Sequence, residues 1–401
     1  MPKVVGLDVC KLSVVACILS VRPNEPRQFY YAAKFYTFDA TAKGIRELLV
    51  EKPDIAVFEP TGVNYSKLWG THLARAGVEV RLVGHRQLHS FRADTLELPD
   101  KDDRADALAL ACYYFDYADR PRRFVQIREP DVAKIREMVL RLAHLNRCQS
   151  PIVNRLRQDL AWQLPEIANI RFKRNGDRLS LVLRYLAGEA NSPKYDRLIK
   201  SSTGLGLTFT VRYHAQRLCH LHREEIEIED ILSLLTSYPK FEFYHRVFDR
   251  FGFGQRVRGM LLSQIYPIEN YLSNEGKPIV VYRRGRKKNN ITKRYLSRRR
   301  FEKALGVAPT ENSSGDKTRK KIVGGSDLCR TALWQWIFVR LEVRKTRPNT
   351  AIGRELASLL DREKATGKPI RLIRMRVASV AARLLFKELV KEKPLTCPKG
   401  N

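Results

Sequence analysis

Apolar and polar positions alternate in two distinct patterns along the first 127 residues. Short β-branched and aromatic runs predict strands at Val4–Val9, Leu12–Val21, Gln28–Phe38, Ile55–Phe58 and Val78–Val83. Amphipathic or Ala- and Leu-rich stretches predict helices at Thr41–Val50, Ser66–Ala76 and Asp103–Tyr114. The polar stretch between Leu88 and Pro99 is expected to be irregular. Strands followed by alternating helices and strands indicate an α/β domain in this part of the chain.

The order of these elements is three strands, a helix, a strand, a helix, a strand and a helix. It matches the RNase H-like fold, so we expect residues 1–127 to form one such domain. Beyond Pro130, apolar residues recur at coiled-coil-like spacing and predict a long helix from 131 to about 164. This helix fits two interpretations equally well, a buried pair of core helices and a projecting helical hairpin or dimer arm.

The remaining chain is predicted to be mainly helical. We divide it into a coiled-coil and helical linker region, residues 128–245, and a mainly α-helical C-terminal domain, residues 246–401. Helices are expected near the end of that domain, at Leu328–Val343 and Val377–Lys391. Residues 173–245 read as mixed helix and loop, without a chemical motif.

Composition narrows the class of protein. With 44% hydrophobic residues, the 401-residue chain can bury real cores, and no apolar run approaches the roughly 20 residues of a membrane span. Its seven cysteines are odd in number and lack CxxC spacing, which is typical of reduced thiols and not of a disulfide framework or a zinc site. We therefore expect a cytoplasmic protein with no membrane partner.

Positive charge is concentrated in the second part of the chain. Residues 1–127 hold 18 basic and 16 acidic residues, whereas residues 128–401 hold 56 and 27. Within that part, residues 283–300 contain ten basic side chains and no acid. A solvated surface loop is the plain interpretation, but so many like charges repel each other unless a polyanion neutralises them. We favour a loop that binds nucleic-acid phosphates through Arg283, Arg284, Arg286, Lys287, Lys288, Lys293, Arg294, Arg298, Arg299 and Arg300.

Four carboxylates lie at the ends of predicted elements that would be neighbours in space. Asp8 is near the end of the first strand and Glu59 ends the fourth, while Asp103 and Asp106 share one helical face. In an RNase H-like sheet those strands are adjacent and the last helix packs across them, so the four carboxylates would converge. Burying that much like charge requires a counter-cation, and Mg²⁺ prefers oxygen ligands. A single acid at a strand end is often a turn residue, but four at these positions predict a magnesium site.

At this point the sequence resembles a known family. The segments GLDVCK (6–11), EPTGVNYSKLW (59–69) and DKDDRADALALA (100–111) are similar to the DEDD motifs of the insertion sequence 110 transposases, the bridge-RNA-guided recombinases. GFGQRVRGMLLSQI (252–265), ALGVAPTENSSG (304–315) and IVGGSDLCRTALW (322–334) resemble the second domain of that family. The chain departs from the family pattern at Cys10, where Ser is usual, and at Asp102, where Thr is usual.

The resemblance implies a RuvC-like first domain whose catalytic, metal-binding tetrad is Asp8, Glu59, Asp103 and Asp106. It also implies a serine nucleophile in the second domain, which matches Ser314, with Ser313 as a close competitor. The implied partners are target and donor DNA, a structured non-coding guide (bridge) RNA that pairs with both, and further copies of the chain in a dimer or tetramer. The coiled-coil segment would mediate that assembly.

A serine hydroxyl is a weak nucleophile and must be activated, here by metal at the tetrad. Lys317, Arg319, Lys320 and Arg330 are close to Ser314 in sequence and would hold the scissile phosphate. Without the resemblance, residues 313–315 read as an ordinary polar turn. The predicted reaction links the protein to one DNA end and then religates it, which needs no ATP, and the sequence contains no GxxxxGK[ST] phosphate loop.

Two other functions compete with this one. A metal-dependent endonuclease of the RuvC type would use the same tetrad with water as the nucleophile, and Ser314 would be dispensable. A non-enzymatic RNA- or DNA-binding protein on the same scaffold is the second alternative. The intact set of four acids argues against the latter, and the long chain beyond the first domain argues against the former.

Overall fold

The computed structural model describes residues 2–60, 64–98, 102–284, 291–314, 317–322 and 324–394. The chain divides into two compact units, Met1–Arg128 and Glu129–Asn401. Among the residues described, no helix is both long and apolar enough to cross a membrane.

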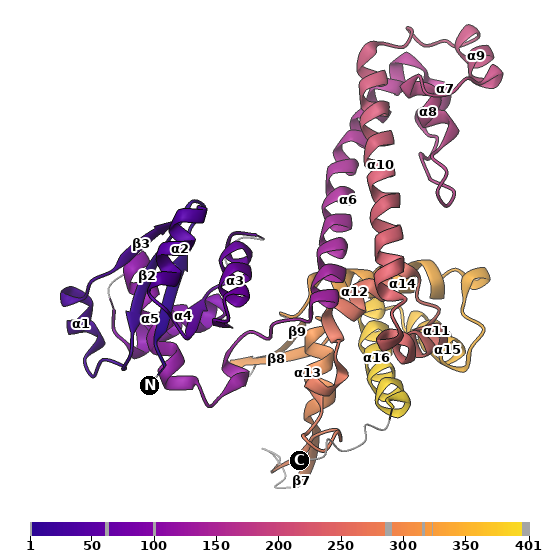
Figure 1. Ribbon diagram of the computed structural model, residues 1–401. Helices are drawn as coiled ribbons and strands as arrows, with labels where there is room; N and C mark the ends of the chain where they lie inside the picture. Colours follow the sequence, from indigo (N-terminus) through magenta and orange to yellow (C-terminus); the bar gives the residue numbers. More distant parts are fainter. Residues whose placement is uncertain are drawn as a thin grey trace. The chain divides into compact units, whose positions relative to one another are not determined.

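The N-terminal unit is built on one five-stranded sheet (Figure 1), in the order β3-β2-β1-β4-β5. Its strands are β1 (Val4–Val9), β2 (Ser13–Leu19), β3 (Tyr36–Asp39), β4 (Ile55–Phe58) and β5 (Glu79–Leu82). Strand β2 pairs antiparallel with both β1 and β3, whereas β4 pairs in parallel with both β1 and β5. This order and these directions are those of the RNase H-like sheet, so the predicted fold is confirmed.

Helices cover both faces of this sheet. They are α1 (Pro26–Ala32), α2 (Ala42–Val50), α3 (Tyr65–Arg75), α4 (His85–Ser90), the π-helical turn Phe91–Thr95, α5 (Asp103–Tyr117) and the 3₁₀ turn Pro121–Arg123. One apolar core lies between the sheet and α2 and α3, and a second lies between the sheet and α5. Because strand side chains alternate between faces, Val5 and Leu7 enter the first core and Val4 enters the second.

The glycine of β1 sets how closely α5 approaches the sheet. A Cβ atom added to Gly6 would lie 2.0 Å from the backbone oxygen of Ala107 and 2.6 Å from the backbone nitrogen of Ala111. The helix therefore rests directly on the backbone of β1. Ala105, Ala107, Ala109 and Ala111 are all fully buried, because only small side chains fit between α5 and its surroundings.

Two predictions for this unit are wrong. The third strand is shorter than expected, because residues 26–32 form α1 and only Tyr36–Asp39 pair with β2. Pro26 opens that helix, and its fixed φ suits a first helical turn. The stretch 88–99, expected to be irregular, contains the end of α4 and the π-helical turn. This stretch contributes four apolar side chains to the α5 core, those of Leu88, Phe91, Leu96 and Leu98. Polar residues between them obscure the apolar spacing in the sequence.

The second unit begins with the predicted long helix. Helix α6 (Pro130–Gln163) runs beside α10 (Phe209–Thr236) along its length (Figure 1), so the two form a helical hairpin within one chain. At the far end of that hairpin, α7 (Pro165–Ala168), α8 (Leu181–Ala187) and α9 (Pro193–Lys200) share a separate small core with both long helices. Assembly of several chains through this segment stays a prediction.

The rest of the unit surrounds one large core at the other end of α6 and α10. It contains α11 (Glu242–Phe251), α12 (Gln255–Ile265), α13 (Leu296–Ala304), α14 (Asp327–Trp336), α15 (Ala351–Lys364) and α16 (Ile370–Glu392). Short turns lie at Pro239–Phe241, Ile268–Tyr271, Ile337–Leu341 and Arg344–Thr346. Two β-hairpins complete it, β6 (Val280–Arg284) with β7 (Ile291–Tyr295) and β8 (Pro309–Ser314) with β9 (Lys317–Ile322). The sequence pattern predicted neither α15 nor the two hairpins.

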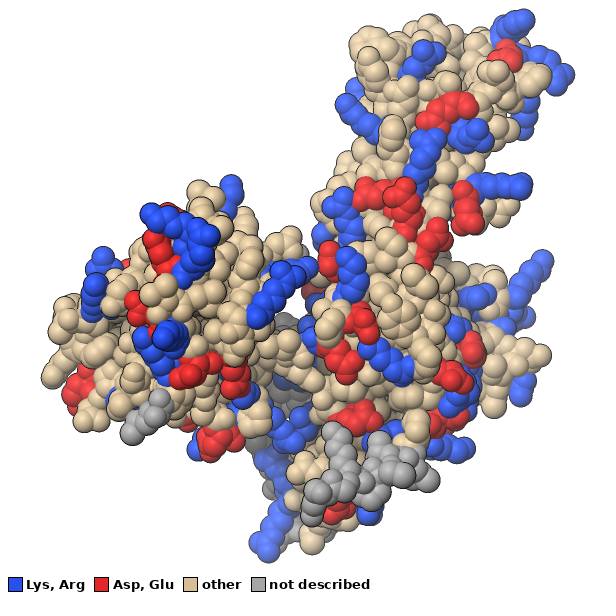
Figure 2. Space-filling view, viewed as in Figure 1, with Lys and Arg blue, Asp and Glu red and all other residues tan. Residues whose placement is uncertain are grey.

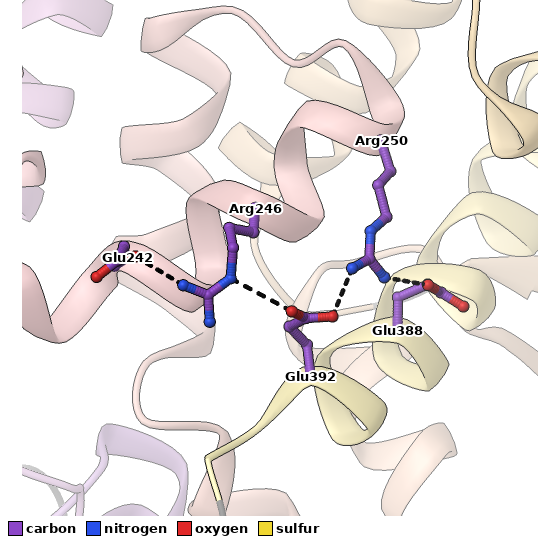
Figure 3. A network of polar contacts seen from close by, with 5 residues as sticks. All are labelled: Glu242, Arg246, Arg250, Glu388 and Glu392. Atoms are coloured by element: carbon purple, nitrogen blue, oxygen red, sulfur yellow. Dashed lines mark hydrogen bonds and ion pairs between the residues drawn. The ribbon is translucent and has the colours of Figure 1, made fainter.

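Ion pairs tie α11 to the end of α16 (Figure 3). Arg250 donates to Glu388 at 2.5 Å and also to Glu392, while Arg246 joins Glu392 at 3.3 Å and Glu242 at 2.7 Å. Each of the three carboxylates in this network contacts at least one of the two guanidinium groups, so every negative charge has a positive neighbour.

Candidate active site

The alternation of side chains along the two central strands places Asp8 and Glu59 on the same face of the sheet. Strands β1 and β4 are parallel, with Leu7 opposite Phe58, so Asp8 and Glu59 follow one residue later at neighbouring strand ends. Val4 and Val57 contribute to the α5 core, and residues an even number of positions away point the same way. Both carboxylates therefore lie at the carboxyl ends of adjacent strands, on the face covered by α5.

Helix α5 brings the other two acids to that edge. Asp103 and Asp106 lie in its first turn, and Gly6 allows this helix to rest on β1 immediately before Asp8. The N-terminus of a helix carries partial positive charge, which favours carboxylates at this position. A sheet edge and a helix start, distant in sequence, thus supply all four predicted acids to one region.

The pKa of Asp8 reports how close these acids are. Burial raises its pKa from 3.8 to about 7, assisted by charge repulsion from Asp103, Asp106 and Glu59 and by a hydrogen bond with Asp103. Each of the other three acids therefore acts on Asp8 directly. The raised pKa means that the negative form of Asp8 is disfavoured by the neighbouring carboxylates. A bound divalent cation would offset the repulsion among these carboxylates.

Two basic side chains hold the outer acids in place. His85, at the start of α4, contacts Glu59, with 2.7 Å between Nδ1 and Oε2. Arg92, which is only 7% exposed, donates to Asp106 at 2.7 Å. Neither residue was predicted from the sequence, because neither forms a motif with the acids. Arg92 lies in the segment expected to be irregular, and His85 precedes that segment. Asp102, which was given no function, accepts a hydrogen bond from the Tyr30 hydroxyl at 2.5 Å.

Cys10 also lies beside the acids, just after β1. Its Sγ atom is 3.9 Å from Oδ2 of Asp103. One ligand atom from each of Asp8, Cys10 and Asp103 lies within 4.8 Å of the other two, close enough for these three side chains to be candidate ligands of one metal ion. Carboxylate oxygens are the ligands that Mg²⁺ prefers, so Asp8 and Asp103 suit a divalent cation. Glu59 and Asp106 are not part of this close group, and each contacts a basic side chain.

The predicted nucleophile lies in the second unit. Ser314 is the last residue of β8, where it pairs with Lys317, and Ser313 pairs with Thr318. Arg319 and Lys320 lie opposite Asn312 and Glu311 in the same hairpin. Gly315, which follows Ser314 in the sequence motif, is outside the described residues. Residues 313 and 314 are thus the last two residues of a strand. Without the family resemblance, the sequence had indicated a polar turn at this position.

Arg330, the fourth predicted phosphate ligand, already has partners within the protein. It lies in α14, donates to the carbonyl of Gly306 at 3.3 Å and forms an ion pair with Asp327. Because Asp327 is largely exposed, this pairing leaves the guanidinium group near the surface.

The basic segment forms a hairpin and a helix, and the expectation of a loop is wrong where the structure describes it. Arg283 and Arg284 lie in β6 and Lys293 and Arg294 in β7, and every residue of both strands is exposed. Arg286, Lys287 and Lys288 fall outside the described residues. Arg298, Arg299 and Arg300 belong to α13, where Arg298 stacks on Tyr295 and pairs with the buried Glu302. In Figure 2, Lys and Arg side chains gather at the lower end of this unit.

Models of known protein families match two parts of the chain. Residues 5–164 match a family model for DEDD transposases of the IS110 type, described as "Transposase". Residues 289–351 match a model described as "Transposase IS116/IS110/IS902 family". No curated protein sequence matches the chain.

Among solved structures, the chain is similar to the RuvC structure of Thermus thermophilus. The two share 16% identity with a TM-score of 0.23, covering 31% of this chain and 99% of that one. The structure of T. thermophilus RuvC in complex with a Holliday junction substrate gives the same identity and TM-score, covering 31% of this chain and 100% of that one.

Proposed function

Because the chain belongs to the insertion sequence 110 family of DEDD transposases, we propose that it cuts, exchanges and rejoins DNA strands through a phosphoserine intermediate. The observation that carries this proposal is the gathering of Glu59, Asp103 and Asp106 around Asp8, at the edge of an RNase H-like sheet. Such a concentration of like charge disfavours folding of the metal-free protein, so its presence favours a catalytic use.

In this proposal Asp8, Glu59, Asp103 and Asp106 hold Mg²⁺. When bound, the metal would act as a Lewis acid that stabilises negative charge on the oxygens of the scissile phosphate. His85 and Arg92 act as positioning residues, because each fixes one outer carboxylate by a hydrogen bond of 2.7 Å. Asp8 and Asp103 remain in contact with each other at the centre of the group.

Ser314 is proposed as the nucleophile. Its hydroxyl oxygen forms a bond to phosphorus, the bond from phosphorus to one bridging deoxyribose oxygen breaks, and that oxygen takes up a proton. In religation a deoxyribose hydroxyl of the exchanged strand attacks the same phosphorus and releases the serine, which regains a proton. One phosphodiester replaces another, so no external energy source is needed. Lys317, Arg319 and Lys320 share the hairpin and provide positive charge for the phosphate.

The nucleic-acid partners are proposed to be target and donor DNA and a structured guide RNA. Support comes from the excess of 56 basic over 27 acidic residues beyond position 127. The β6–β7 hairpin offers a specific contact, because Arg283 and Arg294 lie on one of its faces and Tyr282 and Lys293 on the other, all exposed. A two-stranded ribbon of this kind fits a nucleic-acid groove. A dimer or tetramer is proposed from the family.

A RuvC-type endonuclease with water as its nucleophile is the alternative. It is favoured by one observation, that all four predicted acids belong to the N-terminal unit, so the proposed metal centre needs no residue of the second unit. In that case Ser314 would have no catalytic function.

Serine variants distinguish the two functions. We expect wild-type protein, supplied with guide RNA, DNA and Mg²⁺, to form a covalent protein–DNA adduct that resists denaturation by detergent. Ser314→Ala should abolish that adduct while Ser313→Ala retains it, and Asp103→Asn should abolish strand cleavage while RNA binding survives. Adducts that persist in Ser314→Ala but vanish in Ser313→Ala would move the nucleophile by one residue. Undiminished cleavage without any adduct would favour the endonuclease.

A further inference from the structure

The proposed metal centre contains a sulfur atom that an RNase H-like set of four acids does not require. Cys10 follows β1 directly, two residues after Asp8, and its backbone N–H donates to the carbonyl of Ser13 at 2.9 Å. That backbone hydrogen bond fixes the start of the β1–β2 turn and leaves the side chain exposed. The thiol is therefore held at the sheet edge where the acids converge.

The distances suit a mixed sulfur and oxygen ligand set. Sγ of Cys10 is 3.9 Å from Oδ2 of Asp103, and one ligand atom each from Asp8, Cys10 and Asp103 lies within 4.8 Å of the other two. In a tetrahedral zinc site, a thiolate sulfur and a carboxylate oxygen are about 3.5 Å apart, given their usual bond lengths to the metal. A shift of about 0.4 Å in an exposed side chain is enough to reach that geometry.

We propose that Cys10 is a metal ligand, so that this centre binds thiophilic divalent cations such as Zn²⁺ and Cd²⁺ through Asp8, Cys10 and Asp103. The inference rests on the proposed metal centre and goes beyond it, because it assigns a metal preference that four carboxylates alone would not have. Thiolates favour softer metals and contribute little to Mg²⁺ binding, which relies on oxygen. On binding, the sulfur–metal bond forms and the thiol proton passes to solvent.

Cadmium provides a direct probe, because a cadmium–thiolate bond absorbs in the ultraviolet. The full-length chain is first changed at Cys148 and Cys397 to serine. Cys148 lies 3.4 Å from His144 and offers a rival Cys–His pair, and Cys397 is outside the described residues. The other four cysteines, at positions 17, 112, 219 and 329, are buried. This background is compared with and without Cys10→Ser, which changes one atom of an exposed side chain.

We expect the cadmium–thiolate absorption in the background protein and its loss in Cys10→Ser. Affinity for Cd²⁺ should fall by about 10-fold or more with that change, whereas affinity for Mg²⁺ should change by less than about 2-fold. An absorption band that survives Cys10→Ser, or that never forms, would overturn the inference. A parallel titration with Mn²⁺ keeps the two claims separate: if Asp8→Asn weakens Mn²⁺ binding while Cd²⁺ gives no thiolate band, the acid centre stands and only the sulfur ligand is rejected.

Discussion

Two groups of acidic side chains in this protein are arranged in opposite ways. Between α11 and α16, Glu388 and Glu392 face Arg250, and Arg246 adds a second cation. These hydrogen bonds lower the pKa of Glu392 below its ordinary value. At the edge of the N-terminal sheet, Asp8 faces three other acids, and its pKa rises to about 7. In the first group every carboxylate contacts an arginine. In the second, His85 and Arg92 contact only the outer acids, and Asp8 is surrounded by like charge.

The difference separates a structural network from a functional one. An ion-pair network holds two helices together and needs nothing from outside. A group of like charges opposes folding unless a cation joins it. Four amino-acid changes, from the largest expected effect to the smallest, test this contrast.

Gly6→Ala should disrupt the acid group most strongly. The added Cβ would lie 2.0 Å from the backbone of α5, so the helix must move away from β1 and carry Asp103 and Asp106 with it. We expect a loss of about 3 kcal/mol in the free energy of unfolding, measured with urea, together with loss of DNA cleavage. Gly254→Ala is the matched control, because a Cβ there meets nothing within 4 Å. Equal stability of the two variants would show that α5 does not depend on Gly6.

Arg92→Met should have the next largest effect. The change removes a buried cation that donates to Asp106 and leaves the acid group more negative. We expect the free energy of unfolding to fall by about 2–3 kcal/mol in the absence of metal. Adding Mn²⁺ should recover part of that loss, since the metal replaces some of the missing positive charge. A loss that Mn²⁺ leaves unchanged would indicate that Arg92 only supports packing.

Asp8→Asn should stabilise the metal-free protein at alkaline pH. In the folded state Asp8 has a pKa of about 7, against 3.8 for the ordinary group. Between those values the folded protein keeps a proton that the unfolded chain releases, so stability falls as pH rises and the full cost is present above pH 7. Asn carries no charge and removes this cost. The check is the thermal midpoint of both proteins in chelator from pH 4.5 to 8.5; parallel curves would contradict it.

Arg250→Ala should have the smallest effect of the four. Its side chain is about one-third exposed, and surface ion pairs contribute little. We expect a loss of about 1 kcal/mol in the free energy of unfolding and no change in metal affinity or cleavage. Addition of 1 M salt should reduce the difference from wild type. Altered metal binding in this variant would contradict the view that the acids between α11 and α16 have only a structural function.

The sequence was informative where the local pattern and the fold agree. The order of strands and helices predicts the sheet, and strand parity then places Asp8 and Glu59 on one face. His85 and Arg92 could not be found this way, because they meet the acids only after α4 and the π-helical turn pack against α5. The strand predicted for residues 28–38 is wrong over residues 28–32 because aromatic residues suit both a strand and the partly buried helix α1.

The most direct test of the central claim is the affinity of the full-length protein for Mn²⁺, measured by calorimetry. We predict that Asp8→Asn and Asp103→Asn each weaken binding by about 10-fold or more. Asp116→Asn should bind as the wild type does, because Asp116 lies on the same helix but pairs with Arg22. Equal affinity in all four proteins would contradict the account, since the four gathered acids would then hold no metal.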